Sequence, residues 1–255
     1  MKLKYPAEAF AFGILLFSAG MKEAFTAGVL VILSVAFAEF IKNLLESVIP
    51  AWSLKACVLI STAAVTSSVF LLGFAFLGDP LTVETWVMTL VVGLLSAKCV
   101  LMNDLEGDYG EIFWESGICW GFWVLLAVLR EFAGSGRIFG NMILEMEFQS
   151  KAFLEMTFAF LTAGLVLAFT NGVLKKKCGQ THSLFLVVLA ALYTKPFTME
   201  SFGELAGLLW TIAVPIVLFI SVKKTLKFAR TGQAYRGLPV EMISMGFIYM
   251  ILGIY

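Results

Sequence analysis

The sequence predicts an all-α, polytopic membrane helix bundle of about nine segments, some of them short or broken. Of its 255 residues, 60% are hydrophobic and 14% are charged, and the mean hydropathy is +0.93. A soluble chain carries a larger charged share, about a quarter of its residues. We therefore expect membrane lipid to surround most of the chain. The formal net charge is zero, so nothing indicates a nucleic-acid partner.

Apolar runs define the expected segments, because about 20 residues cross the hydrocarbon core as a helix. They cover approximately residues 7–20, 24–48, 55–78, 85–103, 112–132, 152–174, 182–198, 203–222 and 238–255. The first run ends at the interruption Met21-Lys22-Glu23. The first and seventh runs are short for full spans. Such pieces are half-helices or re-entrant segments, which exist where protein covers their ends.

Basic residues predict the orientation. When the connections are sorted alternately, twelve lysines and arginines fall on the side of the N-terminus and five on the other side. Because loops on the cytoplasmic side are richer in Lys and Arg, we expect the N-terminus in the cytoplasm, in a bacterial-type cytoplasmic membrane. Nine spans would then place the C-terminus outside.

Charged residues within or at the ends of the apolar runs are candidate polar or ion-path residues, because an unpaired charge at membrane depth is costly. Glu39 and Lys42 are three residues apart on one helical face. We favour an ion pair between them over an ion path. Arg130 and Glu131 end the fifth run, where they either shape a polar turn or form a snorkelling pair, and we favour a structural role. Glu241 follows a proline near the start of the last run.

Small residues predict helix packing in the fifth run. Gly117 and Gly121 are spaced i, i+4, which is the pattern that lets two helices approach closely. The pattern therefore supports packing of this helix in a bundle.

The cysteines give no recognisable framework. Cys57, Cys99, Cys119 and Cys178 are irregularly spaced without a CxxC motif, and His182 is the single histidine. This pattern predicts neither a disulfide scaffold nor a zinc site.

Several stretches occur in an order typical of one family. They are the run 94–102 with Cys99, an acidic loop, a glycine-containing helix from 112, the pair Arg130-Glu131 and the loop Gly134-Ser135-Gly136-Arg137-Ile138-Phe139-Gly140. Over residues 1–177 this resembles a divergent E/D-type subunit of the Rnf/Nqr family, a unit of six spans. Residues 178–255, with Arg236-Gly237-Leu238-Pro239, resemble half of the paired A/E-type subunit. The resemblance implies an inverted-repeat fold.

The resemblance implies a complex that moves electrons between NADH and ferredoxin or quinone while moving Na⁺ or H⁺. In the family, paired subunits hold a [2Fe–2S] cluster, each supplying one cysteine from a broken first span and one from the fourth span. Cys99 takes the fourth-span position, and Lys98 stands where the family has Asn. The stretches 17–21 and 193–196 contain no cysteine. The cluster would therefore be shared with a partner chain, with Cys99 as ligand, and we expect this chain alone to bind none.

Two functions follow as hypotheses. The first is a divergent membrane subunit of an Rnf/Nqr-type ion-translocating electron-transport complex, with other redox subunits as partners. No nucleotide-binding loop or flavin-attachment motif is visible, so this chain would be at most a non-nucleotide-binding subunit of an oxidoreductase. The alternative is a transporter-like or scaffolding membrane protein on the same fold that has lost the cluster, since inverted repeats with broken spans also build transporters.

Overall fold

The computed structural model describes residues 4–102, 109–144, 149–176, 183–194, 203–225 and 232–252. Its α-helices are α1 (Ala7–Phe17), α2 (Met21–Leu45), α3 (Ala51–Leu77), α4 (Val83–Met102), α5 (Tyr109–Ser135), α6 (Met156–Leu174), α7 (Ser183–Thr194), α8 (Glu204–Thr225) and α9 (Leu238–Leu252). Shorter elements are β1 (Arg137–Ile138), β2 (Asn141–Met142) and the 3-10 helices η1 (Lys151–Leu154) and η3 (Gln233–Tyr235). The predicted all-α bundle is confirmed for these residues.

Within the described residues, five helices, α2 to α6, are long and apolar enough to cross a membrane. The helices α1 and α9 and the apolar stretches of α7 and α8 are shorter. This length distribution supports an integral membrane protein, as the composition predicts. It also supports the expectation that the first and seventh segments fall short of full spans.

The first interruption lies slightly earlier than predicted. α1 ends at Phe17 and α2 begins at Met21, so the break is the stretch Ser18-Ala19-Gly20. Gly20 is extended, with φ −126° and ψ 153°. Glu23 lies in the first turn of α2 instead of between the helices. An acidic residue is favoured there because the amino end of a helix carries partial positive charge.

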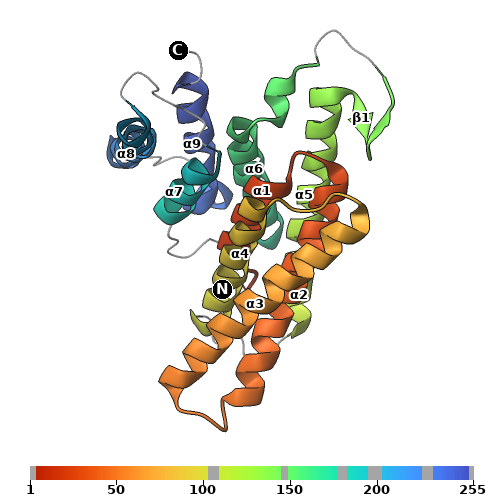
Figure 1. The fold of residues 1–255 in the computed structure, drawn as a ribbon, viewed down its shortest axis with the longest axis vertical. Helices are drawn as coiled ribbons and strands as arrows, with labels where there is room; N and C mark the ends of the chain where they lie inside the picture. Colours follow the sequence, from red (N-terminus) through yellow and green to blue (C-terminus); the bar gives the residue numbers. More distant parts are fainter. Residues whose placement is uncertain are drawn as a thin grey trace.

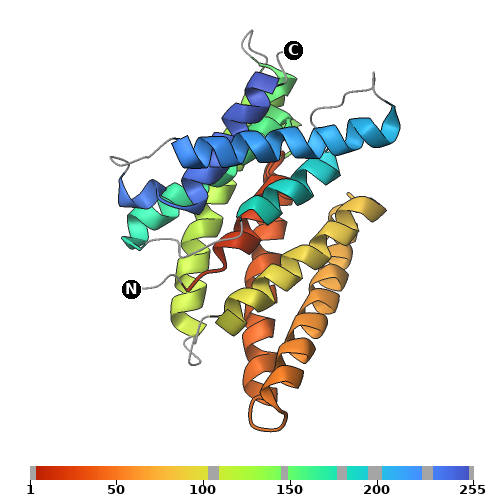
Figure 2. The same ribbon diagram turned by 90° about the vertical axis from the view of Figure 1, so that its left-hand side faces the viewer.

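α1 lies in the interior of the bundle, where it packs against α2, α4, α6 and α7 (Figure 1). α8 runs across the direction of the longer helices (Figure 2). Most of α1 is buried, including Phe10, Phe12 and Ile14. An all-round apolar helix is stable only when it is covered on every side. The sequence of α1 therefore explains its central place.

Glycines set the closest helix approaches. A Cβ on Gly164 of α6 would lie 2.4 Å from Ile243 of α9, and one on Gly246 of α9 would lie 2.8 Å from Leu161 of α6. A Cβ on Gly93 of α4 would lie 2.8 Å from the backbone of Ala63 in α3. Small residues at these crossings let the backbones touch. No such close approach is found at Gly117 and Gly121. A Cβ on either glycine would meet nothing within 4 Å among the described residues.

Candidate functional site

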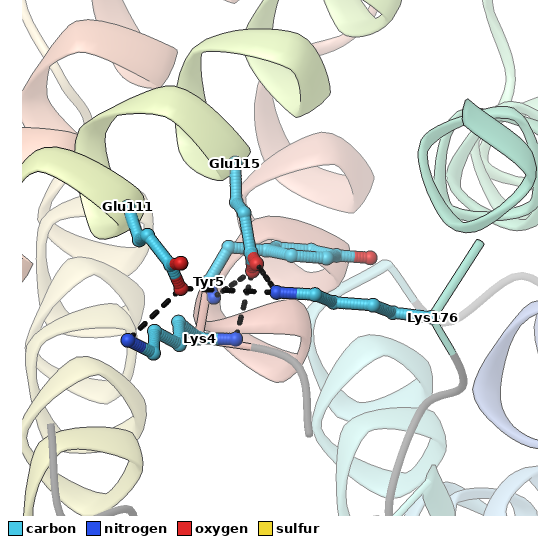
Figure 3. Close-up of polar contacts among 5 residues, drawn as sticks. All are labelled: Lys4, Tyr5, Glu111, Glu115 and Lys176. Carbon is cyan, nitrogen blue, oxygen red and sulfur yellow. Dashed lines mark hydrogen bonds and ion pairs between the residues drawn. The ribbon is translucent and has the colours of Figure 1, made fainter. Parts of the chain in front are cut away.

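The amino end of α1 is held by a glutamate of α5 (Figure 3). Glu115 is 2% exposed, and its Oε2 accepts hydrogen bonds from the backbone N–H groups of Lys4, at 2.8 Å, and Tyr5, at 3.1 Å. Its Oε1 forms an ion pair with Lys176, which follows α6. A carboxylate suits this place, because the amino end of a helix carries partial positive charge.

Two further ion pairs complete the Glu115 cluster, which we define as Lys4, Tyr5, Glu111, Glu115 and Lys176. Lys4 Nζ lies 2.9 Å from Glu111 Oε2, and Lys176 Nζ lies 3.9 Å from the same oxygen. The two lysines and two glutamates balance in charge. Burying charges is tolerated when they are paired and hydrogen-bonded in this way.

A neutral chain of hydrogen bonds extends this cluster toward the C-terminal helices. The Tyr5 hydroxyl donates to Asn171 Oδ1 on α6 at 3.0 Å, and Asn171 Nδ2 donates to the carbonyl of Ala234 in η3 at 3.3 Å. The segment before α1 is therefore tied to α5, α6 and the approach to α9.

The carboxyl end of α1 is held by an arginine of the same helix α5. Arg130 is 6% exposed and donates from Nη1 to the hydroxyl of Ser18, which follows the last residue of α1. Its other donors reach three backbone carbonyls around η1: Phe153 at 2.6 Å, Leu154 at 2.9 Å and Glu155 at 2.7 Å. The planar guanidinium has five N–H donors, which explains how one side chain joins three segments.

Glu131 holds the first residue of α2. Its Oε2 accepts from the N–H of Met21 at 2.8 Å, and its Oε1 accepts from the N–H of Gly140 at 2.9 Å. Arg130 therefore lies at the negative end of α1 and Glu131 at the positive end of α2, the arrangement that helix dipoles favour. We call Ser18, Met21, Arg130, Glu131 and the η1 carbonyls the Arg130 cluster. Both charged side chains are buried within the protein.

The loop after α5 needs its glycines. Gly136 and Gly140 have φ of 68° and 79°, a region where other residues are strained, and Phe139 between them also has a positive φ of 58°. A Cβ on Gly136 would lie 2.2 Å from the carbonyl oxygen of Leu144. Lys22 Nζ lies 5.4 Å from the centre of the Phe139 ring, a cation–π contact between the loop and α2.

The other charged candidates behave differently. Among the described residues, no ion pair joins Glu39 to Lys42, so the pair expected from their spacing is not formed. Glu39 Oε1 instead accepts a long hydrogen bond of 3.4 Å from Asn43 Nδ2, although Glu39 and Lys42 are both buried. Glu241 lies in the first turn of α9 and is partly buried.

An ion pair that the sequence did not predict joins α4 to α1. Lys98 Nζ of α4 donates to Glu8 Oε2 of α1 at 2.6 Å. Each is a lone charge inside an apolar segment, and such residues seek one another because burial without a partner is costly. That signal could have indicated the pair.

The described cysteines do not fit a cluster held by this chain alone. Cys57 is exposed, Cys99 partly buried and Cys119 buried, while Cys178 lies outside the described residues. Within the described residues, no three His, Cys, Asp or Glu side chains gather as a metal site. Cys99 follows Lys98, which pairs with Glu8, and the break at Ser18 begins ten residues later along α1. Ten helical residues span about 15 Å, so Cys99 is far from the break.

No family model, curated protein or solved structure matches this chain. The function is therefore inferred from the two clusters and from the break at the Arg130 cluster.

Sequence reasoning found Arg130 and Glu131 but missed most of their partners. It also missed Glu115 and Lys176, whose contact joins residues 61 positions apart. Glu115 lies one helical turn after Glu111, and two glutamates at the start of an apolar helix were the available signal.

Proposed function

We propose that this chain is a membrane subunit of an ion-translocating electron-transport complex of the Rnf/Nqr type, in a bacterial-type cytoplasmic membrane with its N-terminus on the cytoplasmic side. One observation carries the proposal. The residues behind the resemblance, Arg130, Glu131 and the loop that ends at Gly140, converge on the break between α1 and α2. Residues at the end of α5 thus hold the two helix ends at the break in the first segment.

A break of this kind suits ion handling. Discontinuous helices place backbone dipole ends inside a membrane protein, where they interact with ions and charged substrates. Here Arg130 and Glu131 fix both helix ends, so the break keeps one geometry while the surrounding helices form the path. In this proposal the chain provides part of the membrane path, and partner chains provide the NADH, flavin and ferredoxin chemistry.

Cys99 is the residue of this chain that would serve a shared redox centre. It is partly exposed on α4, so a partner chain could approach it. A [2Fe–2S] cluster needs four ligands, usually thiolates, so the partner would supply the remainder. We derive no electron-transfer step from this chain alone.

The C-terminal helices would form the fused half-unit. In this proposal residues 1–177 are the six-span unit, and 178–255 are half of an inverted partner. The close α6–α9 crossing at Gly164 and Gly246 supports a permanent association of the two parts.

The proposal is tested by isolating the tagged chain from its native membrane in mild detergent. We expect flavin- and iron–sulfur-binding subunits to co-purify, and NADH- or ferredoxin-driven Na⁺ or H⁺ uptake by membrane vesicles to disappear when the gene is deleted. Isolation of the chain alone, together with unchanged uptake in the deletion strain, would overturn the proposal.

Cys99→Ser tests the shared cluster separately. An EPR signal of the isolated complex that is lost in Cys99→Ser and kept in Cys57→Ser would assign Cys99 as a ligand. Cys57 is the matched control because it is exposed on α3. An unchanged signal in Cys99→Ser removes this chain from the cluster.

A transporter-like protein on the same fold is the second candidate. It is favoured by the break itself together with the separation of Cys99 from it. Purified chain in liposomes distinguishes the two: cation or solute flux without redox partners supports a transporter, whereas flux only with electron donors and partner chains supports the complex.

A further inference from the structure

Glu39 is a buried carboxylate in the last two turns of α2, which packs against α3, α4 and α5. It lies on α2, its side chain is 0% exposed, and it is next to Ala38 and one turn from Val35, which pack with Val58 of α3 and Ala97 of α4. These neighbours are apolar. An ionised carboxylate in such surroundings costs several kcal/mol unless a counter-charge or several donors meet it.

Its hydrogen bonding falls well short of that requirement. Oε1 has the long contact with Asn43 Nδ2 at 3.4 Å, and Oε2 is buried without a hydrogen-bond partner. Asn43 is itself shared, since its Nδ2 also donates to the Tyr109 hydroxyl at 3.1 Å. A carboxylate oxygen offers lone pairs to a donor or a cation. Oε2 therefore has unused capacity to bind a cation.

Neutral oxygens with the same deficit lie in the same helix group. Thr62 and Thr66 of α3 and Ser116 of α5 are buried, and their hydroxyl oxygens have no hydrogen-bond partner. Hydroxyls in helices usually bond to the preceding turn, as Ser96 of α4 does with the carbonyl of Val92. These hydroxyls are therefore further buried oxygens that could bind a ligand, because no group of the protein hydrogen-bonds to them.

The helix pairing places Thr62 level with Glu39. A Cβ on Gly73 of α3 would lie 3.1 Å from Leu30 of α2, which fixes where these antiparallel helices meet. Glu39 is nine residues beyond Leu30, and Thr62 is eleven residues before Gly73. These separations correspond to about 14 and 17 Å along the helices, so the two side chains are within one turn of each other in height.

Among the described residues, no basic side chain on α2 or on the helices packed around it forms an ion pair with Glu39. Lys98 of α4 pairs with Glu8, and Glu111 of α5 pairs with Lys4. Lys55 of α3 is exposed. Lys42, one turn away on α2, is buried and forms no ion pair with Glu39 among the described residues.

We propose that Glu39 is a binding site for a monovalent cation, at which a proton or Na⁺ neutralises the carboxylate inside the bundle. The proposal rests on the ion-translocating function proposed above and names the residue that would carry the ion. A proton binds Oε2 directly. Na⁺ binds Oε2 together with neutral oxygens, for which Thr62 and Thr66 are equally near in height.

Labelling with dicyclohexylcarbodiimide tests the site on the purified full chain in detergent. This reagent modifies carboxyl groups that are protonated in apolar surroundings, and mass spectrometry of the peptides locates the product. We expect labelling at Glu39 that falls as the pH rises and is lost in Glu39→Gln. Na⁺ separates the two ions: slower labelling with Na⁺ than with choline assigns a Na⁺ site, and equal labelling assigns a proton site.

Glu46 provides the control, because it is exposed at the end of the same helix. We expect little labelling at Glu46, and Glu46→Gln should leave the labelling of Glu39 unchanged. No labelling of Glu39 at any pH, or labelling that appears only in Lys42→Met, would overturn the proposal, because the carboxylate would then be neutralised by other means.

These outcomes are independent of the proposed function. Labelling uses the isolated chain and is measured on the wild-type protein, so it does not depend on the folding of a variant. Failure of the labelling leaves co-purification and redox-driven uptake intact, and failure of those experiments leaves the labelling result intact.

Discussion

The two ends of α1 are held by the same helix, α5, with opposite chemistry. At the amino end, Glu115 meets the charged side chain of Lys176 as well as backbone N–H groups. At the carboxyl end, the hydrogen-bond partners of Arg130 are uncharged oxygens: the Ser18 hydroxyl and the three carbonyls around η1. The first end depends on balanced charge, whereas the second depends on the direction of the hydrogen bonds.

This difference shows how a short helix can be fixed inside a membrane bundle. Both anchors interact favourably with the helix dipole, because an anion lies at the amino end and a cation at the carboxyl end. The two anchors should tolerate substitution differently. Glu115 can be neutralised together with its partner Lys176, whereas the hydrogen bonds of Arg130 require a planar guanidinium.

Arg130→Met should give the largest loss. It removes the guanidinium that donates to the three carbonyls around η1 and to the Ser18 hydroxyl, and we expect the protein to lose about 3–5 kcal/mol of stability. Arg130→Lys should recover less than half of this loss, because an ammonium cannot reproduce the planar fork. Thermal unfolding in detergent measures both. Equal stability of Arg130→Lys and the wild type would contradict the directional account.

Glu115→Gln should cost somewhat less, about 3 kcal/mol, mainly because the Lys176 ammonium loses its closest counter-charge. The double variant Glu115→Gln/Lys176→Met should regain part of that loss, in contrast to any double variant at Arg130. Urea or thermal unfolding of the four proteins gives the coupling energy as a double-mutant cycle. Additive losses would show that charge balance is not what holds this end.

Glu131→Ala should cost about 1–2 kcal/mol, the usual effect of removing an acceptor from the first turn of a helix. Glu131→Gln keeps an acceptor for Met21 N–H and should lose about half as much. Hydrogen exchange of the first turn of α2 is the sensitive measurement. Unchanged protection in Glu131→Ala would contradict its assignment as the anchor of α2.

Glu111→Gln should have the smallest effect, under about 1 kcal/mol, since the Glu111 side chain is 42% exposed. The loss should shrink further when NaCl is raised, because salt screens exposed pairs. The loss in Arg130 variants should depend much less on salt, because Arg130 is buried and its hydrogen-bond partners are uncharged. A salt-dependent loss at Arg130 would remove the distinction between the two ends.

The helices were predictable because each is a local apolar run. Such a run forms a helix in lipid or in the protein interior, independently of which helices it packs against. The break was predictable only approximately. The charges of Lys22 and Glu23 suggested an interruption there, but both residues enter α2, where the amino end stabilises Glu23. Small residues at Ser18-Ala19-Gly20 marked the true break.

The two clusters could not be predicted, because their contacts join distant parts of the chain. Glu115 and Lys4 are 111 residues apart, and Tyr5 and Asn171 are 166 residues apart. No periodicity within one helix records such a pairing. The glycines show the same limit: the i, i+4 pattern of Gly117 and Gly121 faces open space, while the α6–α9 crossing uses one glycine from each helix.

The separation between α1 and its anchors also sets an order of events during synthesis. Arg130 is made 112 residues after Ser18, a delay of roughly 5–20 s at ordinary translation rates. During that interval α1, with 11 residues, is too short to span the bilayer and lacks the side chains that later fix its ends. α1 is therefore synthesised well before it can reach its final place, and insertion machinery or lipid headgroups must accommodate it until α5 and α6 arrive.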